Sequence, residues 1–201
     1  MPGKKPDRRV ARTRELLLDA FIRLMVERGY EKMTVQHLLD RSGVGRATFY
    51  AHFKSKDDLL ASSVGRLQAR LRGAWAEVQE AQSGVESRLA FSRGFFRHVD
   101  GHRRIYDLIV GRPSEVTLDR HMRRMLAELV REELASWPGA RRSSRALEVA
   151  VQFVSGALWS LMVWWIASRA RLSADEVNTH FRRLAFQGLD GSFGRLASRV
   201  D

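Results

Sequence analysis

Apolar residues recur along this chain at intervals of three and four, the spacing that places them on one face of an α-helix. Between residues 12 and 28 the series is Leu17, Ala20, Phe21, Leu24 and Met25. Gly29 follows it and is expected to end the first helix. No strand-like alternation of useful length occurs, so we predict an all-α protein of about nine helices.

Capping residues divide the rest of the chain. Thr34 suits the N-cap of a short second helix with Leu38 and Leu39 inside. Ser55, with acids in the following turn, opens a long fourth helix to about residue 81 that is expected to connect the two parts of the protein. The remaining helices are predicted from about Val85 to Gly101, over 105–109, from Ser114 to about Leu134, from Ser143 or Ser144 to about Ser168, and from the capping box at 173–176 onward.

Residues 34–56 contain two short helical segments separated by the sequence Ser-Gly-Val-Gly at 42–45. Gly43 stands where a helix usually needs a left-handed residue to end. The second segment, from about Arg46 to His52, presents polar side chains outward, and Lys54 and Lys56 follow it. This is the pattern of a helix-turn-helix that lays its second helix in the major groove of DNA.

Composition is consistent with DNA binding but does not establish it alone. The chain has 201 residues, 44% of them hydrophobic, and a formal net charge of +12, which suits a polyanionic partner. It has no cysteine, so disulfides and thiolate chemistry are excluded. Residues 1–11 form a basic segment that is either a solvated, flexible tail or an arm that reaches phosphate or the minor groove.

One uncharged stretch, residues 149–168, is long enough to cross a membrane. Gln152, Ser155 and Ser160 interrupt it, and the flanking segments are typical of soluble amphipathic helices. The same stretch suits the centre of a helical domain or a subunit interface. We therefore keep a membrane-anchored protein only as a remote alternative and expect a cytoplasmic one.

The segment from Gly43 to Leu60, Gly-Val-Gly-Arg-Ala-Thr-Phe-Tyr-Ala-His-Phe-Lys-Ser-Lys-Asp-Asp-Leu-Leu, resembles the signature of the TetR family of bacterial transcriptional regulators. The resemblance is strong over residues 12–61. It implies a DNA-binding domain at residues 1–55 and an effector-binding and dimerisation domain at 56–201. It further implies a homodimer that binds a palindromic operator and represses transcription until a small molecule releases it.

The resemblance also assigns DNA-contacting positions, and Gly45 departs from it because the family commonly has Ser or Thr there. A Gln amide can pair with adenine and an Arg can fork onto guanine, so Gln36 and Arg46 are candidate base contacts. The remaining positions are expected to contact backbone or bases. The full set is Thr34, Gln36, Gly45, Arg46, Thr48, Tyr50, His52, Lys54 and Lys56.

Large apolar side chains are frequent after residue 70 and suit an apolar ligand site as well as an ordinary core. The candidate effector-binding residues are Trp75, Phe95, Tyr106, Met122, Met125, Trp159 and Met162. Few acids lie among them, which favours an apolar or anionic effector. The candidate dimer-interface residues are Phe153, Gly156, Trp164, Phe181, Leu184 and Gly188.

The sequence does not support an enzyme, because it has no phosphate-binding glycine loop, nucleophile elbow or acid–histidine cluster at metal-ligand spacing. No cofactor is expected. His98 and His102 are four residues apart and are a candidate metal site with His121, but Gly101 is expected to break the helix between them, which argues against such a site. Within DNA binding, the alternative is a constitutive or architectural regulator without an effector.

Overall fold

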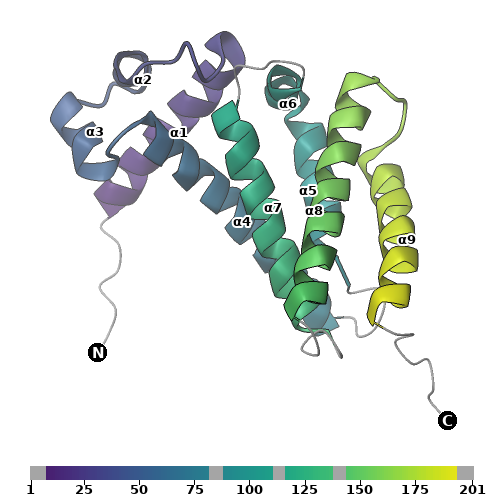
Figure 1. Ribbon diagram of the computed structural model, residues 1–201. Coiled ribbons are helices and arrows are strands. Elements are labelled where there is room, and N and C mark those ends of the chain that lie inside the picture. The colour runs from purple at the N-terminus through teal and green to yellow at the C-terminus, as the bar shows by residue number, and fades with distance from the viewer. Residues whose placement is uncertain (1–7, 82–87, 111–115, 138–143, 194–201) are drawn as a thin grey trace, which may run out of the picture.

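The computed structural model describes residues 8–81, 88–110, 116–137 and 144–193. Within these ranges the chain forms nine α-helices and no strand, which confirms the all-α prediction. The helices are α1 (Arg8–Arg28), α2 (Val35–Ser42), α3 (Arg46–His52), α4 (Lys56–Ala81), α5 (Phe91–Gly101), α6 (Arg103–Ile109), α7 (Val116–Ala135), α8 (Ser144–Ala167) and α9 (Ala174–Phe193). Figure 1 shows α1 to α3 gathered at one end, with α8 and α9 side by side at the opposite edge.

The first three helices enclose a small core. Leu17, Phe21 and Leu38 are buried together with Phe49 of α3 and Phe53 just after it. Gly29 and Gly43 both have positive φ, at 74° and 68°, as their places after α1 and α2 require. Helix α1 begins at Arg8, earlier than the predicted residue 12, so residues 8–11 are helical and not part of a flexible arm. Residues 1–7 of that expected arm lie outside the described residues.

Helix α4 runs diagonally from the α3 end of the molecule into the C-terminal helices (Figure 1). Its start is capped as predicted, because the Ser55 hydroxyl accepts the Asp58 N–H at 3.2 Å. Its apolar series is buried as far as Leu71, whereas Ala74 is exposed. Farther along, Gln68 and Arg72 bind Glu128 and Glu132 of α7, so α4 and α7 are tied by polar contacts as well as by packing.

Helix α5 begins later than its apolar series predicted. Leu89 has a φ of 52°, a left-handed conformation that cannot continue a helix, so α5 starts at Phe91 and Val85 falls outside the described residues. The α5 face that bears Phe95, Phe96 and Val99 is fully buried. Gly94 of α5 lies so close to α4 that an added Cβ would stand 3.1 Å from the Leu71 side chain. The predicted closure of α6 and the opening of α7, at 111–114, fall on residues that are not described.

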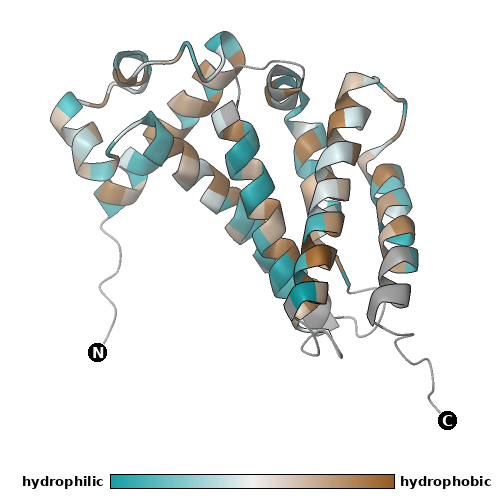
Figure 2. Ribbon diagram, viewed as in Figure 1, coloured by the Kyte–Doolittle hydropathy of each residue, from teal (hydrophilic) through white to brown (hydrophobic). Residues whose placement is uncertain are grey.

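Most of α8 is apolar or weakly polar, as Figure 2 shows. It is the one described helix long and apolar enough to cross a membrane, yet half of that stretch is buried inside the protein. Val151, Val154, Leu158 and Met162 lie in the same core as α5, α7 and α9. Helix α8 is therefore the central helix of the C-terminal half. This agrees with the interpretation of the uncharged stretch as the centre of a helical domain.

Candidate functional site

The α2–turn–α3 unit is held by its own caps and by α1. The Thr34 hydroxyl accepts the His37 N–H at 3.2 Å, while His37 Nδ1 accepts the Thr34 N–H at 3.3 Å, which forms a reciprocal capping box. Arg41 binds both carboxylate oxygens of Glu27, so α2 is fixed to the end of α1. Gly45 caps α3 with its backbone alone. These contacts set the angle at which α3 is presented.

Helix α3 has one buried side and one exposed side. Phe49 is buried, and Tyr50 next to it is 49% exposed, its ring meeting Phe49 edge-on at a centroid distance of 5.3 Å. Arg46 and Thr48 are exposed, and His52 is half-buried. The structure thus places the polar side chains of α3 toward solvent, where a DNA groove would meet them, and their individual DNA contacts remain predictions.

The two candidate base-reading side chains are already paired with each other. Arg46 Nη2 donates to Gln36 Oε1 at 2.9 Å, and Gln36 Nε2 donates to Asp40 Oδ1 at 2.8 Å. This exposed chain of hydrogen bonds joins α2 to α3. A base edge has to compete with it, so Gln36 and Arg46 must exchange partners if they read bases.

The two lysines after α3 differ. Lys54 is exposed and its side chain has no hydrogen-bond partner among the described residues. The Lys56 ammonium instead donates to the carbonyls of Tyr30 at 3.0 Å, Met33 at 3.1 Å and Glu31 at 3.4 Å, just beyond the end of α1. It also lies 4.4 Å from the centre of the Tyr30 ring. In this arrangement only the Lys56 backbone N–H at the start of α4 is available for the predicted phosphate contact. The ammonium can make that contact only if it leaves these carbonyls.

This surface also includes residues outside the candidate DNA-binding set. A shallow concavity beside α3 is lined by the α2–α3 turn, by Thr48 and His52, and by Arg9 and Thr13 of α1. Because α1 begins at Arg8, its first turn brings basic and hydroxyl side chains against the turn. Phosphate contacts commonly use such groups. The signal in the sequence is the run of arginines at 8–14, for which the sequence does not separate a solvated tail from an arm that reaches phosphate.

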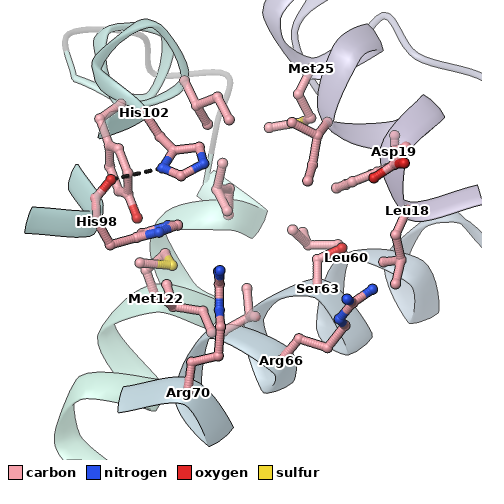
Figure 3. Close-up of a pocket in the computed structure, with 17 residues that line it drawn as sticks. Leu18, Asp19, Met25, Leu60, Ser63, Arg66, Arg70, His98, His102 and Met122 are labelled. Atoms are coloured by element: carbon pink, nitrogen blue, oxygen red, sulfur yellow. Dashed lines mark hydrogen bonds between the residues drawn. The ribbon is translucent and has the colours of Figure 1, made fainter. Parts of the chain in front are cut away.

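A second feature is a cavity of about 300 Å³, which we call the junction cavity. Its walls come from α1, α4, α5, α6 and α7, including Leu18 and Met25 of α1, Leu60 of α4 and Met122 of α7 (Figure 3). It thus lies where the first three helices meet the C-terminal helices. Apolar cavities of 300 to 1,000 Å³ with a few polar groups are typical of small-molecule sites.

Two histidines form the polar wall of the junction cavity. The rings of His98 and His102 are stacked with centroids 4.2 Å apart, so the end of α5 at Gly101 does not separate them as we expected. His102 Nδ1 donates to the His98 carbonyl at 2.9 Å. Burial, helped by the nearby His102 and Arg70, lowers the pKa of His98 to about 4. Among the described residues no group of three His, Cys, Asp or Glu is arranged to hold a metal ion.

The candidate effector residues are distributed unevenly. Tyr106 and Met122 line the junction cavity. Phe95, Met125, Trp159 and Met162 are buried in the packed core and do not line this cavity. Trp75 is half-buried near the far end of α4, away from the cavity wall. Large apolar side chains in this half are mostly core, and sequence spacing could not separate the cavity-lining ones from the rest.

Large apolar side chains are exposed on α8 and, at one position, on α9. Phe153 is 54% exposed, Trp164 49% and Leu184 61%, and Val149, which the sequence analysis did not select, is 65% exposed. Gly156 lies between them, and a Cβ added there would meet only open space. The prediction that Phe181 lies at the dimer interface is wrong, because its side chain is buried against Phe96 inside the protomer. Gly188 lies in a part of α9 whose side chains are not described.

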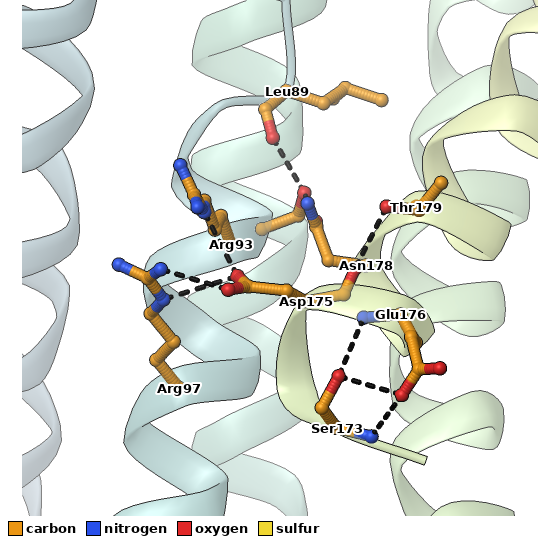
Figure 4. A network of polar contacts seen from close by, with 9 residues as sticks. Leu89, Arg93, Arg97, Ser173, Asp175, Glu176, Asn178 and Thr179 are labelled. Carbon is orange, nitrogen blue, oxygen red and sulfur yellow. Dashed lines mark hydrogen bonds and ion pairs between the residues drawn. The ribbon is translucent and has the colours of Figure 1, made fainter.

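Polar contacts fix α9 against α5 (Figure 4). Asp175 accepts from Arg93 and Arg97 of α5, and these arginines hold the pKa of its carboxyl well below the usual range. The buried Ser92 hydroxyl lies 2.6 Å from Asn178 Oδ1. At the start of α9, Ser173 and Glu176 form the predicted capping box. The exposed face of α8 and α9 is therefore presented on a rigid support.

Comparisons with known proteins agree with this geometry. The family model described as bacterial regulatory proteins, tetR family, matches residues 17–62. The HTH-type transcriptional repressor KstR2 of Mycolicibacterium smegmatis is 24% identical over 196 residues, which cover 92% of this chain and 94% of that one. The regulator YxbF of Bacillus subtilis is 39% identical over 69 residues, so the match spans only 34% of this chain and 18% of YxbF.

Solved structures share the fold over nearly the whole chain. The crystal structure of RolR in complex with the ligand resorcinol has a TM-score of 0.60 to this protein and 17% sequence identity. The match covers 96% of this chain and 99% of that one. At this level of identity the likeness shows the arrangement of the helices and nothing about the ligand.

Proposed function

This chain belongs to the TetR family of bacterial transcriptional regulators, and we propose that it is a homodimeric repressor that a small molecule releases from its operator. The observation that carries the proposal is the position of the junction cavity, which has α1 as one wall and α4, α6 and α7 as others. A ligand there touches α1 of the DNA-binding domain, the connecting helix α4, and α5, α6 and α7 of the C-terminal half.

DNA binding in this proposal is centred on α3. Its exposed groups, from Arg46 to Tyr50, enter the major groove, while Thr34, Lys54 and the first turn of α1 contact phosphates on either side. The Thr34 oxygen already accepts the His37 N–H, so its own proton is available to a phosphate oxygen. A palindromic operator matches a two-fold dimer, because each protomer then meets an equivalent half-site.

Dimerisation is assigned to the exposed face of Phe153, Trp164, Leu184 and Val149. Several large apolar side chains exposed on two packed helices are typical of subunit interfaces. The face also accounts for the uncharged stretch without a membrane, because one side of α8 is core and the other is covered by a second copy. A cytoplasmic location follows from binding chromosomal DNA.

Release is a population shift between two spacings of the recognition helices. The two half-sites of a palindrome are one helical turn, or a multiple of it, apart, so the dimer binds only when its α3 helices have that separation. A ligand in the junction cavity that changes the angle between α1 and α4 favours the other spacing. Differential affinity of the ligand for the two states of about 3 kcal/mol lowers operator affinity roughly a hundredfold.

The test uses operator DNA selected from random or genomic fragments, with binding followed by fluorescence anisotropy and mass by light scattering. Tyr50→Ala is expected to weaken operator binding at least tenfold while the dimer stays intact. Tyr50→Phe removes only the hydroxyl, so it separates the contribution of the hydroxyl to operator binding from that of the ring. The matched control is Thr179→Ala, an exposed substitution on α9 far along the chain from α3.

Two outcomes decide the proposal. Unchanged operator binding by Tyr50→Ala would remove α3 as the DNA-contacting helix. A ligand screen in which compounds bind the protein but never release the operator would favour the alternative of a regulator without an effector.

A further inference from the structure

The charges around the junction cavity are unbalanced. Arg66 and Arg70 extend from α4 at its mouth, and Asp19 of α1 is the one carboxylate in its lining (Figure 3). Within the part of the chain that the structure describes, neither arginine forms an ion pair or a hydrogen bond. Two guanidinium groups on consecutive turns of one helix therefore face the cavity without an anion between them.

The inner polar groups do not supply that anion. His98 is neutral at physiological pH, because burial lowers its pKa to about 4. The hydrogen bond from His102 Nδ1 to a carbonyl places a proton on that nitrogen, because a carbonyl oxygen can only accept. Burial raises the pKa of Tyr106 well above its ordinary value of 10.0, which keeps its hydroxyl protonated and able to donate.

Arg70 is the arginine that reaches this inner group. It lines the same cavity as His98 and Tyr106, and its positive charge lowers the pKa of both groups. Figure 3 shows Arg70 directed from α4 toward His98, across from the α1 wall. Guanidinium groups bind carboxylates through two parallel hydrogen bonds, and the Tyr106 hydroxyl is a further donor on the same side.

The opposite wall is apolar. Leu18, Met25 and Leu60 line it from α1 and α4, and Met122 closes it from α7. Methionine side chains adapt to irregular or flat apolar molecules. A molecule that fits both walls has a charged end and a hydrocarbon or aromatic body.

We propose that the effector is an amphipathic monoanion whose carboxylate binds Arg70 and the Tyr106 hydroxyl while its apolar body packs against α1. This inference rests on the proposed function, release of the operator by a small molecule. Binding in this manner connects α4 to α6 through the carboxylate and fills the space beside α1. The inference therefore names both the chemical class of the effector and the residue that selects it.

The first experiment uses two fluorescent probes that share an anilinonaphthalene body and differ by one sulfonate group. The anion 8-anilinonaphthalene-1-sulfonate and the neutral N-phenyl-1-naphthylamine are titrated into the full-length protein at fixed ionic strength, without DNA. Arg70→Gln is expected to weaken the anionic probe tenfold or more and to leave the neutral probe within twofold. The matched control is Arg104→Gln, which removes an equal charge from an exposed position of α6 outside the cavity lining.

The second experiment tests the carboxylate directly. Decanoate and decanamide have the same apolar chain, and each is used to displace N-phenyl-1-naphthylamine. Decanoate is expected to displace it at a concentration at least tenfold lower than decanamide in the wild type, and the difference should vanish in Arg70→Gln. Circular dichroism of each variant checks that the fold is retained.

Several results would overturn the inference. They are equal displacement by acid and amide, equal loss of both probes in Arg70→Gln, or an equal loss of the anionic probe in Arg104→Gln, which would indicate general surface charge. The proposed function is tested separately by adding saturating decanoate to the operator complex. If decanoate binds through Arg70 but does not release the DNA, the inference about the site stands and ligand release is refuted. If only an uncharged compound releases the DNA, ligand release stands and the inference is refuted.

Discussion

The Lys56 ammonium offers the sharpest test of how the first three helices are joined to α4. It donates to the carbonyls of Tyr30, Glu31 and Met33, which follow α1, and it is also the first residue of α4. Lys56→Met keeps most of the aliphatic stem and the contact with the Tyr30 ring, but removes all three hydrogen bonds. We expect the variant to be less stable because half-buried carbonyls then lack a donor.

The magnitude follows from these contacts. A hydrogen bond to a charged group contributes about 1.5 to 3 kcal/mol, but here three acceptors share one partly exposed ammonium, so the contributions do not add. The substitution also removes a positive charge from the N-terminus of α4, which returns about 0.5 kcal/mol. The expected net loss is about 2 kcal/mol, which corresponds to a Tm lower by about 4 to 8 °C for a protein of this size.

The assay is thermal unfolding followed by circular dichroism, with operator anisotropy measured in parallel. Lys54→Met is the matched control, since Lys54 is exposed and its ammonium has no partner among the described residues. The control should keep its Tm but lose a phosphate contact, which lowers the salt dependence of operator binding by about one unit of slope. A Tm for Lys56→Met within about 1 °C of wild type would show that the three carbonyl contacts contribute nothing measurable, and the reasoning would fail.

Four further predictions concern the C-terminal half. Burial raises the pKa of Glu133 above its ordinary 4.5, so the folded state loses stability as the pH rises from 4.5 through the raised value; Glu133→Gln should abolish that loss in Tm-versus-pH curves. Burial lowers the pKa of His98 from 6.5 to about 4, so stability should fall as the pH drops through this window, and His98→Gln should flatten the curve. Asn178→Leu removes the side-chain partner of the buried Ser92 hydroxyl, which keeps the Leu89 carbonyl at 2.6 Å as an acceptor, so the expected cost in urea unfolding is only about 1 kcal/mol. A double substitution of Phe153 and Trp164 by Ser should yield monomers in light scattering, and an unchanged dimer would place the interface elsewhere.

The sequence alone determined the parts of this protein that depend on local interactions. Helix spacing, the capping residues Thr34, Ser55 and Ser173, and the left-handed Gly29 and Gly43 all act within a few residues of the chain. Their positions were therefore predicted, and with them the helix-turn-helix and the exposure of Tyr50.

The tertiary structure decided which residues from distant helices meet. Phe181 and Leu184 both belong to the apolar series of α9. In the structure Phe181 packs on Phe96, whereas Leu184 faces solvent. The Lys56 ammonium binds the backbone just beyond α1, at Tyr30, which lies 26 residues earlier in the chain. The junction cavity likewise exists only because α1, α4, α6 and α7 pack around unfilled space, and helical periodicity records which side of each helix is apolar but not how several helices fit together.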